Sequence, residues 1–188
     1  MEKGLSRTQF LDKALEAYSN WYDIERKTSI NIPLVATASF HEHQTGFALV
    51  RKAEMWSADR HEYVFIYSIP TLDIETFNKC IEDTRSRGDQ LVDPVFGHMC
   101  TNIVTLFICN NATDDALKAL KKYRYIKSFL FSLKGWLDAH TAAVVLDNSN
   151  VCCNFSGRQT GEFMKKLLLR LSGEQKQYKL FKIGGNKV

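Results

Sequence analysis

The stretch Tyr125–Gly161, YIKSFLFSLKGWLDAHTAAVVLDNSNVCCNFSGRQTG, decides the fold class of this chain. Apolar residues alternate over about 126–134 and again over about 136–146, and this period of two predicts a pair of β-strands. Between them we expect Gly135 to give the backbone freedom for a tight break, with Trp136 anchoring the second strand in the core. So short a connection favours an antiparallel pair.

The end of the same stretch predicts a turn, a short strand and a helix. Asp147-Asn148-Ser149-Asn150 is typical of a turn, and a short strand is expected over 151–154. Ser156 and Gln159 have the spacing of a helix-capping box. The apolar stripe of the predicted helix consists of Phe163, Leu167 and Leu171.

The rest of the chain alternates between helical and strand periods. Ser6 and Gln9 repeat the capping-box pattern before an apolar stripe that runs on to Tyr22, and Gly88 is a typical helix stop. The segment 102–109 is apolar on both alternating sets, which predicts a central strand covered on both faces. The full prediction is helices over about 6–22, 72–87 and 113–123, strands over 34–43, 47–57, 62–69 and 102–109, turns at 44–46 and 57–60, and a loop over 89–98.

These elements predict an α+β fold. We expect a mostly antiparallel sheet of about six or seven strands, flanked by about four helices. The order also allows two α-β-β-β-α halves around the strand at 103–109, although no residues match between them. We expect residues 1–172 to form a single domain and 173–188 to form a basic C-terminal tail.

Composition places the chain among ordinary globular proteins. It has 188 residues, 45% of them hydrophobic, and a net charge of +4 to which the tail contributes most. No apolar run is long enough to cross a bilayer, and the N-terminus has no apolar signal segment, so a cytoplasmic location is expected. Five cysteines without a Cys-x-x-Cys pair predict reduced, buried thiols and no thiolate metal site.

Several segments together resemble a known family. They are FALVRKAEMW (47–56), HEYVFIYS (61–68), HMCTNIVTLFIC (98–109), KSFLFSLKGW (127–136) and VCCNFSGRQTGEFMKKLL (151–168). The combination is similar to uncharacterised proteins of Clostridia and related Firmicutes that are known only as a domain of unknown function. The resemblance covers about 10–171. It implies a bacterial, cytoplasmic, single-domain protein and transfers no catalytic residue, ligand or cofactor.

His41 and His43 are weak candidates for metal ligands. Alternate residues of a strand share a face, so the two imidazoles point the same way while Glu42 points away. A third ligand would have to come from His61, Glu62 or Asp59. Solvated polar residues at a strand end explain the pattern without any metal.

A metal-dependent nuclease or phosphodiesterase is the alternative enzyme hypothesis. The predicted order of elements resembles the restriction-endonuclease-like core, which holds a metal ion with carboxylates and a nearby lysine. Here Glu54 and Glu62 would share the ion across a hairpin, with Lys52 beside them. The Glu-x-Lys signature itself is missing its lysine, and charged residues on an exposed sheet face explain these positions equally well.

The turn before the last helix is a candidate anion site. It combines Ser156, Gly157, Arg158 and Thr160 with a helix N-terminus, where backbone N–H groups favour negative charge, and Lys134 would add a second cation. The turn lacks the Gly-Lys-Ser/Thr ending of a P-loop. Helix capping alone also explains Ser156.

Two weaker hypotheses rest on shared strand faces. Asp138 and His140 lie two residues apart, so Cys152 or Cys153 on a neighbouring strand could complete a cysteine-hydrolase site, although a core location suits such thiols better. Aromatic and basic residues could instead bind single-stranded nucleic acid, unless they are packing residues. Those residues are Trp56, Tyr63, Tyr67, Trp136, Arg51, Lys52 and Lys134.

We therefore expect a non-enzymatic, cytoplasmic binding domain for a polyanion or a protein partner. Nucleic acid is a further possible partner, and the nuclease is the alternative function. No cofactor is predicted, and no pattern indicates the ligand or the oligomeric state.

Overall fold

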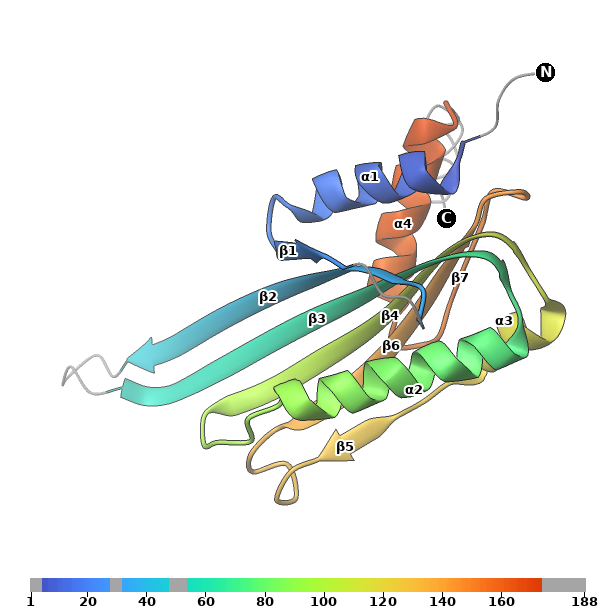
Figure 1. The fold of residues 1–188 in the computed structure, drawn as a ribbon. Coiled ribbons are helices and arrows are strands. Elements are labelled where there is room, and N and C mark those ends of the chain that lie inside the picture. Colours follow the sequence, from blue (N-terminus) through green and yellow to red (C-terminus); the bar gives the residue numbers. More distant parts are fainter. Residues whose placement is uncertain (1–4, 28–31, 48–53, 174–188) are drawn as a thin grey trace, which may run out of the picture.

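The computed structural model of the chain describes residues 5–27, 32–47 and 54–173. For residues 43–47 and 54–58 it describes the backbone only. In the described residues, four helices lie around one sheet, in the arrangement that Figure 1 shows. The elements follow in the order α1 (Arg7–Tyr18), β1 (Asp23–Arg26), β2 (Leu34–Phe47), β3 (Glu54–Leu72), α2 (Ile74–Leu91), β4 (His98–Ala112), α3 (Asp114–Lys122), β5 (Ile126–Ser128), β6 (Trp136–Val145), β7 (Asn150–Cys153) and α4 (Arg158–Leu171). The α+β class agrees with the prediction, and so do the four helices, but the first three strands differ: β1 was not expected, and β3 takes in the end of one predicted strand, 47–57, and all of another, 62–69.

The seven-stranded sheet is mixed, with the strand order β1-β2-β3-β4-β6-β5 and with β7 also paired to β6. Four pairings are antiparallel, but β3–β4 and β4–β6 at the centre are parallel. The expectation of a mostly antiparallel sheet is therefore confirmed in part: most pairings are antiparallel, but the centre of the sheet is parallel. Parallel neighbours need a crossover connection, and α2 and α3 lie in the two crossovers.

The two predicted halves are matched only in their order of elements. In the first half β1, β2 and β3 form a meander of successive neighbours. In the second half β5 and β7 pair with the two ends of β6, at residues 136–138 and 142–145. The strand arrangements of the halves thus differ.

The hairpin between β2 and β3 lies further along the chain than predicted. β2 continues to Phe47, and β3 runs without a break from Glu54 to Leu72. The turns expected at 44–46 and 57–60 are wrong, because these segments pair with each other, as Gln44 does with Ala58. Their polar composition belongs to long strand ends that reach beyond the helices (Figure 1).

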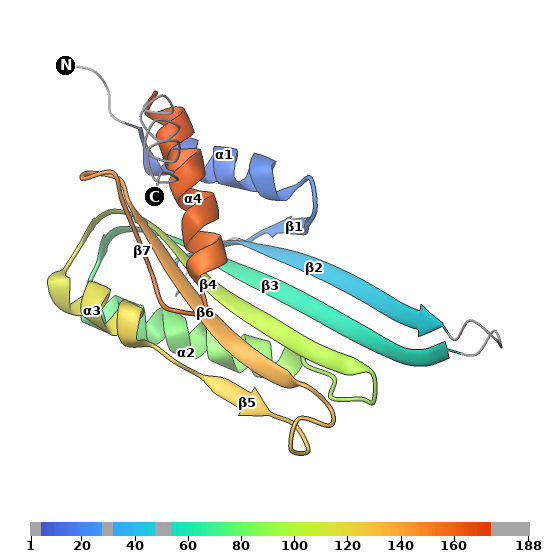
Figure 2. The ribbon, with the colours of Figure 1, turned by 180° about the vertical axis from the view of Figure 1, so that it is seen from behind.

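Helices cover both faces of the sheet (Figure 2). One face packs against α1 and α4, and its buried residues include Val64, Val104 and Ala142. The other packs against α2 and α3 through residues such as Phe65 and Phe107. The central strand β4 is buried on both faces, as its unbroken apolar run predicted.

Helix α1 begins as predicted and ends earlier. The Ser6 hydroxyl and the Gln9 side chain form the expected capping box. The helix ends at Tyr18, so Trp21 and Tyr22 lie in the turn before β1, a strand that the sequence did not predict.

Gly88 lies inside α2 and does not end it. A Cβ atom at this position would be 2.7 Å from Cγ2 of Ile103 on β4. The glycine therefore allows α2 to approach the sheet closely, and the helix continues to Leu91 through the first part of the predicted loop.

The connection between β5 and β6 is longer than a tight break. β5 ends at Ser128, and the following turn has positive φ angles at Leu130, Phe131 and Ser132. Gly135 has a φ of 75°, so it provides the predicted backbone freedom. Trp136 is 36% exposed and does not anchor the core, because it begins the part of β6 that extends past the helices.

The cysteines are free thiols, four of them buried and Cys153 half-buried. This agrees with the prediction of reduced, buried thiols. Among the described helices, none has the length and apolar character that a membrane span requires.

Candidate functional site

A polar row crosses the sheet on the face that carries α1 and α4. Glu62 on β3 pairs in register with Asn102 on β4, which in turn pairs with Asp138 on β6. Two residues further along β6, His140 points to the same face, because alternate strand residues share a side. The row lies just beyond the apolar residues that the two helices cover.

A cleft opens above this row, between the C-terminal end of α1 and helix α4. Its volume is about 610 Å³. Glu62 and His140 belong to its floor, while aromatic side chains dominate its walls. The lining residues are Ala17, Tyr18, Asn20, Trp21, Tyr22, Phe40, Glu62, His140, Gln159, Thr160, Phe163 and Arg170.

Glu62 is held in place by hydrogen bonds. The Tyr22 hydroxyl donates to Oε1 of Glu62 at 2.8 Å, and Nδ2 of Asn102 lies 3.5 Å from Oε2. Burial, and then the charge of Glu62, raise the pKa of Tyr22 well above its usual value. Tyr22 therefore stays protonated and remains a donor to the carboxylate at neutral pH.

His140 and Asp138 form a pair beside Glu62. Nε2 of His140 lies 3.5 Å from Oδ2 of Asp138, whose Oδ1 is buried without a hydrogen-bond partner among the described residues. Burial lowers the pKa of His140, although the charges of Asp138 and Glu62 oppose this shift. The imidazole is therefore mainly neutral at neutral pH. Oδ1 of Asp138 remains an acceptor without a donor among the described residues.

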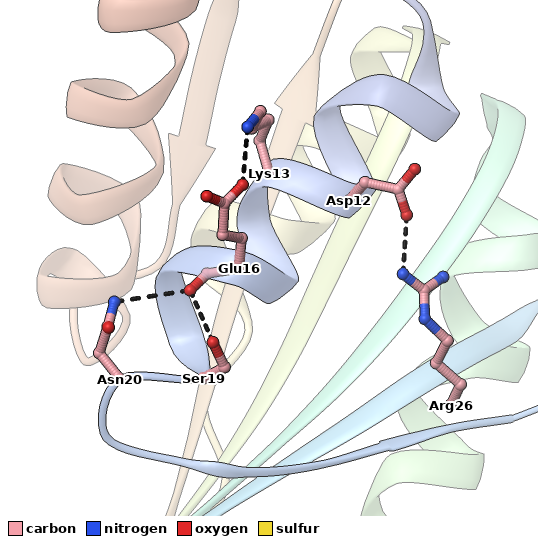
Figure 3. Close-up of polar contacts among 6 residues, drawn as sticks. All are labelled: Asp12, Lys13, Glu16, Ser19, Asn20 and Arg26. Carbon is pink, nitrogen blue, oxygen red and sulfur yellow. Dashed lines mark hydrogen bonds and ion pairs between the residues drawn. The ribbon is translucent and has the colours of Figure 1, made fainter.

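Polar contacts fix the end of α1 that forms one wall of the cleft (Figure 3). Ser19 and Asn20 donate to the carbonyl oxygen of Glu16 at 2.8 Å and 3.5 Å, which caps the end of the helix. Arg26 on β1 lies 2.7 Å from Asp12 of α1. An exposed ion pair stabilises little by itself, but here it ties the helix to the sheet edge.

The α4 wall depends on Asn154. Its Oδ1 accepts from the backbone N–H groups of Thr141 and Gly157, and its Nδ2 donates to the carbonyl oxygens of Tyr123 and Ala139. The side chain thus fills the gap along β6 between β5 and β7. It also sets where α4 begins.

The predicted anion turn is only partly assembled. The N-cap of α4 is Gly157 without a side-chain capping bond, so the capping box at Ser156 is wrong. Arg158 lies over the Phe155 ring at 4.2 Å, and Thr160 is buried. Lys134 precedes the first residue of β6, Trp136. Gly157 packs against Thr141, which lies five residues, or about 17 Å, beyond Trp136 along that strand. Anion binding at this turn stays a prediction, and Lys134 is too far away to be part of the site.

The nuclease residues are not brought together. Glu54 and Glu62 lie on the same strand, β3, eight positions and about 26 Å apart, so they cannot share an ion. The predicted hairpin between them does not exist, because β3 is unbroken. Lys52 lies outside the described residues.

His41 does meet another histidine, but it is His61 across the β2–β3 pair. Their Nδ1 atoms are 2.8 Å apart, and the His98 ring stacks on His61 at 6.0 Å. Both ring nitrogens of His98 already have partners, the Lys134 carbonyl oxygen and the Thr101 hydroxyl. The side chain of His43 lies outside the described ones, and these contain no group of three or more potential metal ligands.

The two weaker hypotheses fare differently. Asp138 and His140 do pair, but Cys152 packs on the opposite face, and Cys153 pairs with Ala142 beneath Gly161 of α4. The proposed nucleic-acid surface is divided: Tyr67 is fully buried and Tyr63 faces the same way, whereas Trp136 is on the other face. Trp56 is described only in its backbone, and Arg51 lies outside the described residues.

Sequence reasoning named Glu62 in the metal and nuclease hypotheses, and Asp138 and His140 together in the cysteine-hydrolase hypothesis, but it did not join them. Tyr22 was assigned to a helix, and Asn102 to the core. The available signal was polar residues interrupting apolar strands at 62, 102 and 138. These three positions can be recognised as neighbours only when the parallel order of β3, β4 and β6 is known.

Comparisons with known proteins identify a family and no relative of known activity. The sequence profile of a family described as "Domain of unknown function (DUF8052)" matches residues 6–166. No curated protein matches the chain. No solved structure matches it either.

Proposed function

Because the chain belongs to the DUF8052 family of unknown function, we propose its role from its own geometry: it is a non-enzymatic binding domain of the cytoplasm. The ligand site is the cleft between α1 and α4. The observation that carries this proposal is the cleft itself, about 610 Å³ with aromatic walls and two polar groups on its floor. Small-molecule sites are usually such concave, mostly apolar pockets with a few convergent polar groups.

The described groups favour binding over chemistry. Glu62 is tied to Tyr22, which orients the carboxylate as a recognition group. Burial raises the pKa of the Cys153 thiol, so this cysteine is poorly suited to be a catalytic nucleophile with His140 as its general base. A small molecule or a short peptide segment suits the volume of the cleft.

A fragment screen by two-dimensional NMR tests the proposal. Fragments that bind should perturb the indole N–H of Trp21 and the side-chain amide of Gln159, both of which line the cleft. Two substitutions from opposite walls, Ala17→Trp and Gln159→Trp, should each weaken these hits at least tenfold, because the added ring fills the cleft. Gln159 is exposed, so the second variant does not endanger folding.

Lys118→Trp is the matched control, because Lys118 is exposed on α3 at the opposite face of the sheet. It should leave every hit unchanged. Fragments that map elsewhere, or that bind both blocking variants as tightly as the wild type, would refute the cleft as the ligand site.

A further inference from the structure

The chemistry of the cleft also indicates which class of ligand it takes. This inference rests on the proposed function, because it needs the cleft to be the ligand site. Three features carry it: the charge on the floor, the arrangement of the aromatic rings, and the acceptors that have no strong donor.

The inner end of the cleft is negatively charged. Glu62 raises the pKa of both Tyr18 and Tyr22 after burial does, so its field extends along the α1 wall. His140 adds little positive charge at neutral pH, because burial lowers its pKa.

Two cations, Arg60 and Arg170, lie near the cleft, and among the described residues neither forms an ion pair with Glu62. Arg60 lies two positions before Glu62 on the same face of β3, and its charge also lowers the pKa of His140. Its side chain is exposed, and its opposing effect on the pKa of Tyr22 is the smallest of the four causes. Arg170 lines the cleft ten residues after Thr160 on α4, which is about 15 Å along a helix. Glu62 therefore remains available to a cationic ligand.

Aromatic rings surround this carboxylate. The ring centroid of Tyr22 lies 5.5 Å from that of Phe40 and 5.0 Å from that of Tyr18. The ring centroids of Tyr18 and Phe163 are 5.1 Å apart. Trp21 is 76% exposed and lines the same cleft. The faces of aromatic rings attract cations, and tryptophan does so most strongly.

Glu62, on the floor of the cleft, can accept a further hydrogen bond. Oε2 of Glu62 has only the 3.5 Å contact with Asn102, which leaves lone pairs for a further donor. Behind the floor, next to His140, the buried Oδ1 of Asp138 does not line the cleft and adds negative charge without a hydrogen-bond partner among the described residues. An ammonium group supplies three donors and needs no acceptor.

We propose that the cleft binds an organic cation: a protonated amine on an apolar or aromatic body. The ammonium group lies against Glu62. The body lies along Tyr18, Trp21 and Phe163. A ligand of this class satisfies the carboxylate, covers the exposed indole and needs no group from outside the chain.

The test compares three probes of nearly the same shape and different charge: phenethylamine, 2-phenylethanol and 3-phenylpropionate. Each is titrated into the wild-type protein, and the NMR shifts of cleft residues give the dissociation constant. The amine should bind at least tenfold more tightly than the alcohol and the carboxylate. Glu62→Gln keeps an acceptor for the Tyr22 hydroxyl but removes the charge, so it should abolish this preference.

Glu16→Gln is the charge-matched control, because Glu16 is an exposed carboxylate of α1 that pairs with Lys13 and does not line the cleft. It should leave the preference intact. Trp21→Ala should weaken amine binding several-fold, and Trp21→Phe should weaken it less, since phenylalanine keeps a ring face.

The outcomes separate this inference from the proposed function. Equal binding of the three probes, or an amine preference that survives Glu62→Gln, would refute the proposal that the ligand is a cation. The proposal that the cleft is the ligand site would still stand. The same holds if no probe binds while the fragments of the earlier screen do. If neither fragments nor probes perturb the cleft, both proposals fall.

Discussion

At the scale of single residues, Asn154 joins three parts of the fold. Its side chain makes four hydrogen bonds, to the backbone of Tyr123, Ala139, Thr141 and Gly157. The residue is only 3% exposed, so these backbone groups have no easy replacement partner in water. A single amide thus replaces the missing strand between β5 and β7.

We predict that Asn154→Ala lowers the free energy of unfolding by about 3 kcal/mol, since it leaves several buried backbone groups unpaired. Asn154→Asp should also destabilise, because a carboxylate can accept from Thr141 but cannot donate to Ala139. Urea unfolding followed by circular dichroism measures both. The exposed turn residue Asn148 is the control, and Asn148→Ala should change stability by less than about 0.5 kcal/mol.

His140 makes stability depend on pH. Burial lowers its pKa, and also that of His61, below the value of about 6.5 expected for an unfolded chain. The unfolded state then takes up protons at a higher pH than the folded state does. The stability that depends on these two histidines should therefore be complete above about pH 6.5 and fall as the pH drops below it.

Denaturant midpoints between about pH 7.5 and pH 5.5 measure this loss. His140→Gln should reduce the slope and leave the part due to His61. The lowered pKa values of Asp73 and Asp115 act only below about pH 4, so they do not contribute in this window. A slope that is unchanged in the variant would show that His140 does not titrate as its burial requires.

At the scale of secondary-structure elements, the contact between α2 and β4 depends on a missing side chain. Gly88 is buried, and an added Cβ would lie 2.7 Å from Cγ2 and 2.8 Å from Cδ1 of Ile103. Ile103 is itself buried, which limits how far it can move. Close packing here outweighs the better helix propensity of alanine, which is about 1 kcal/mol.

We predict that Gly88→Ala destabilises the protein by about 1–3 kcal/mol through overpacking. In an Ile103→Ala background the same change should cost nothing or should stabilise the helix. A double-mutant cycle of unfolding free energies measures this coupling. Additive effects of the two substitutions would mean that the contact does not limit the approach of α2.

Element types were predictable because local patterns decide them, whereas strand neighbours were not. The apolar run at 102–109 and the capping box at Ser6 each have a local cause, and the structure contains both. The hairpin position depended on whether polar residues at 57–60 turn or pair, which is decided across strands. The site has the same limit: Glu62 and Asp138 become neighbours of Asn102 only through parallel pairing.

At the scale of the whole molecule, the thiols report on how closed the fold is. All five cysteines have free thiols, and burial raises the pKa of each of them. For Cys80 and Cys109 the pKa is raised to about 12. Thiolates, which are the reactive form, are therefore scarce in the folded protein.

We predict that a thiol reagent such as Ellman's reagent modifies at most one cysteine, the half-buried Cys153, in the native protein, and all five after unfolding in urea. Cys153→Ser should remove the native reaction. Rapid modification of two or more thiols without denaturant would contradict the burial of Cys80, Cys100, Cys109 and Cys152.

The parallel centre of the sheet governs how the molecule reaches its fold in time. Partners on β3 and β4, such as Tyr63 and Ile103, lie about 40 positions apart, so a long loop must close before they pair. β2 and β3 are joined by a hairpin and can form early, while β4 and β6 must wait for α2 and α3. Non-local pairing of this kind places refolding in the millisecond-to-second range, which stopped-flow fluorescence can resolve. The backbone amides of β4 should then be among the last to exchange with deuterium, because both neighbouring strands have to separate before water reaches them.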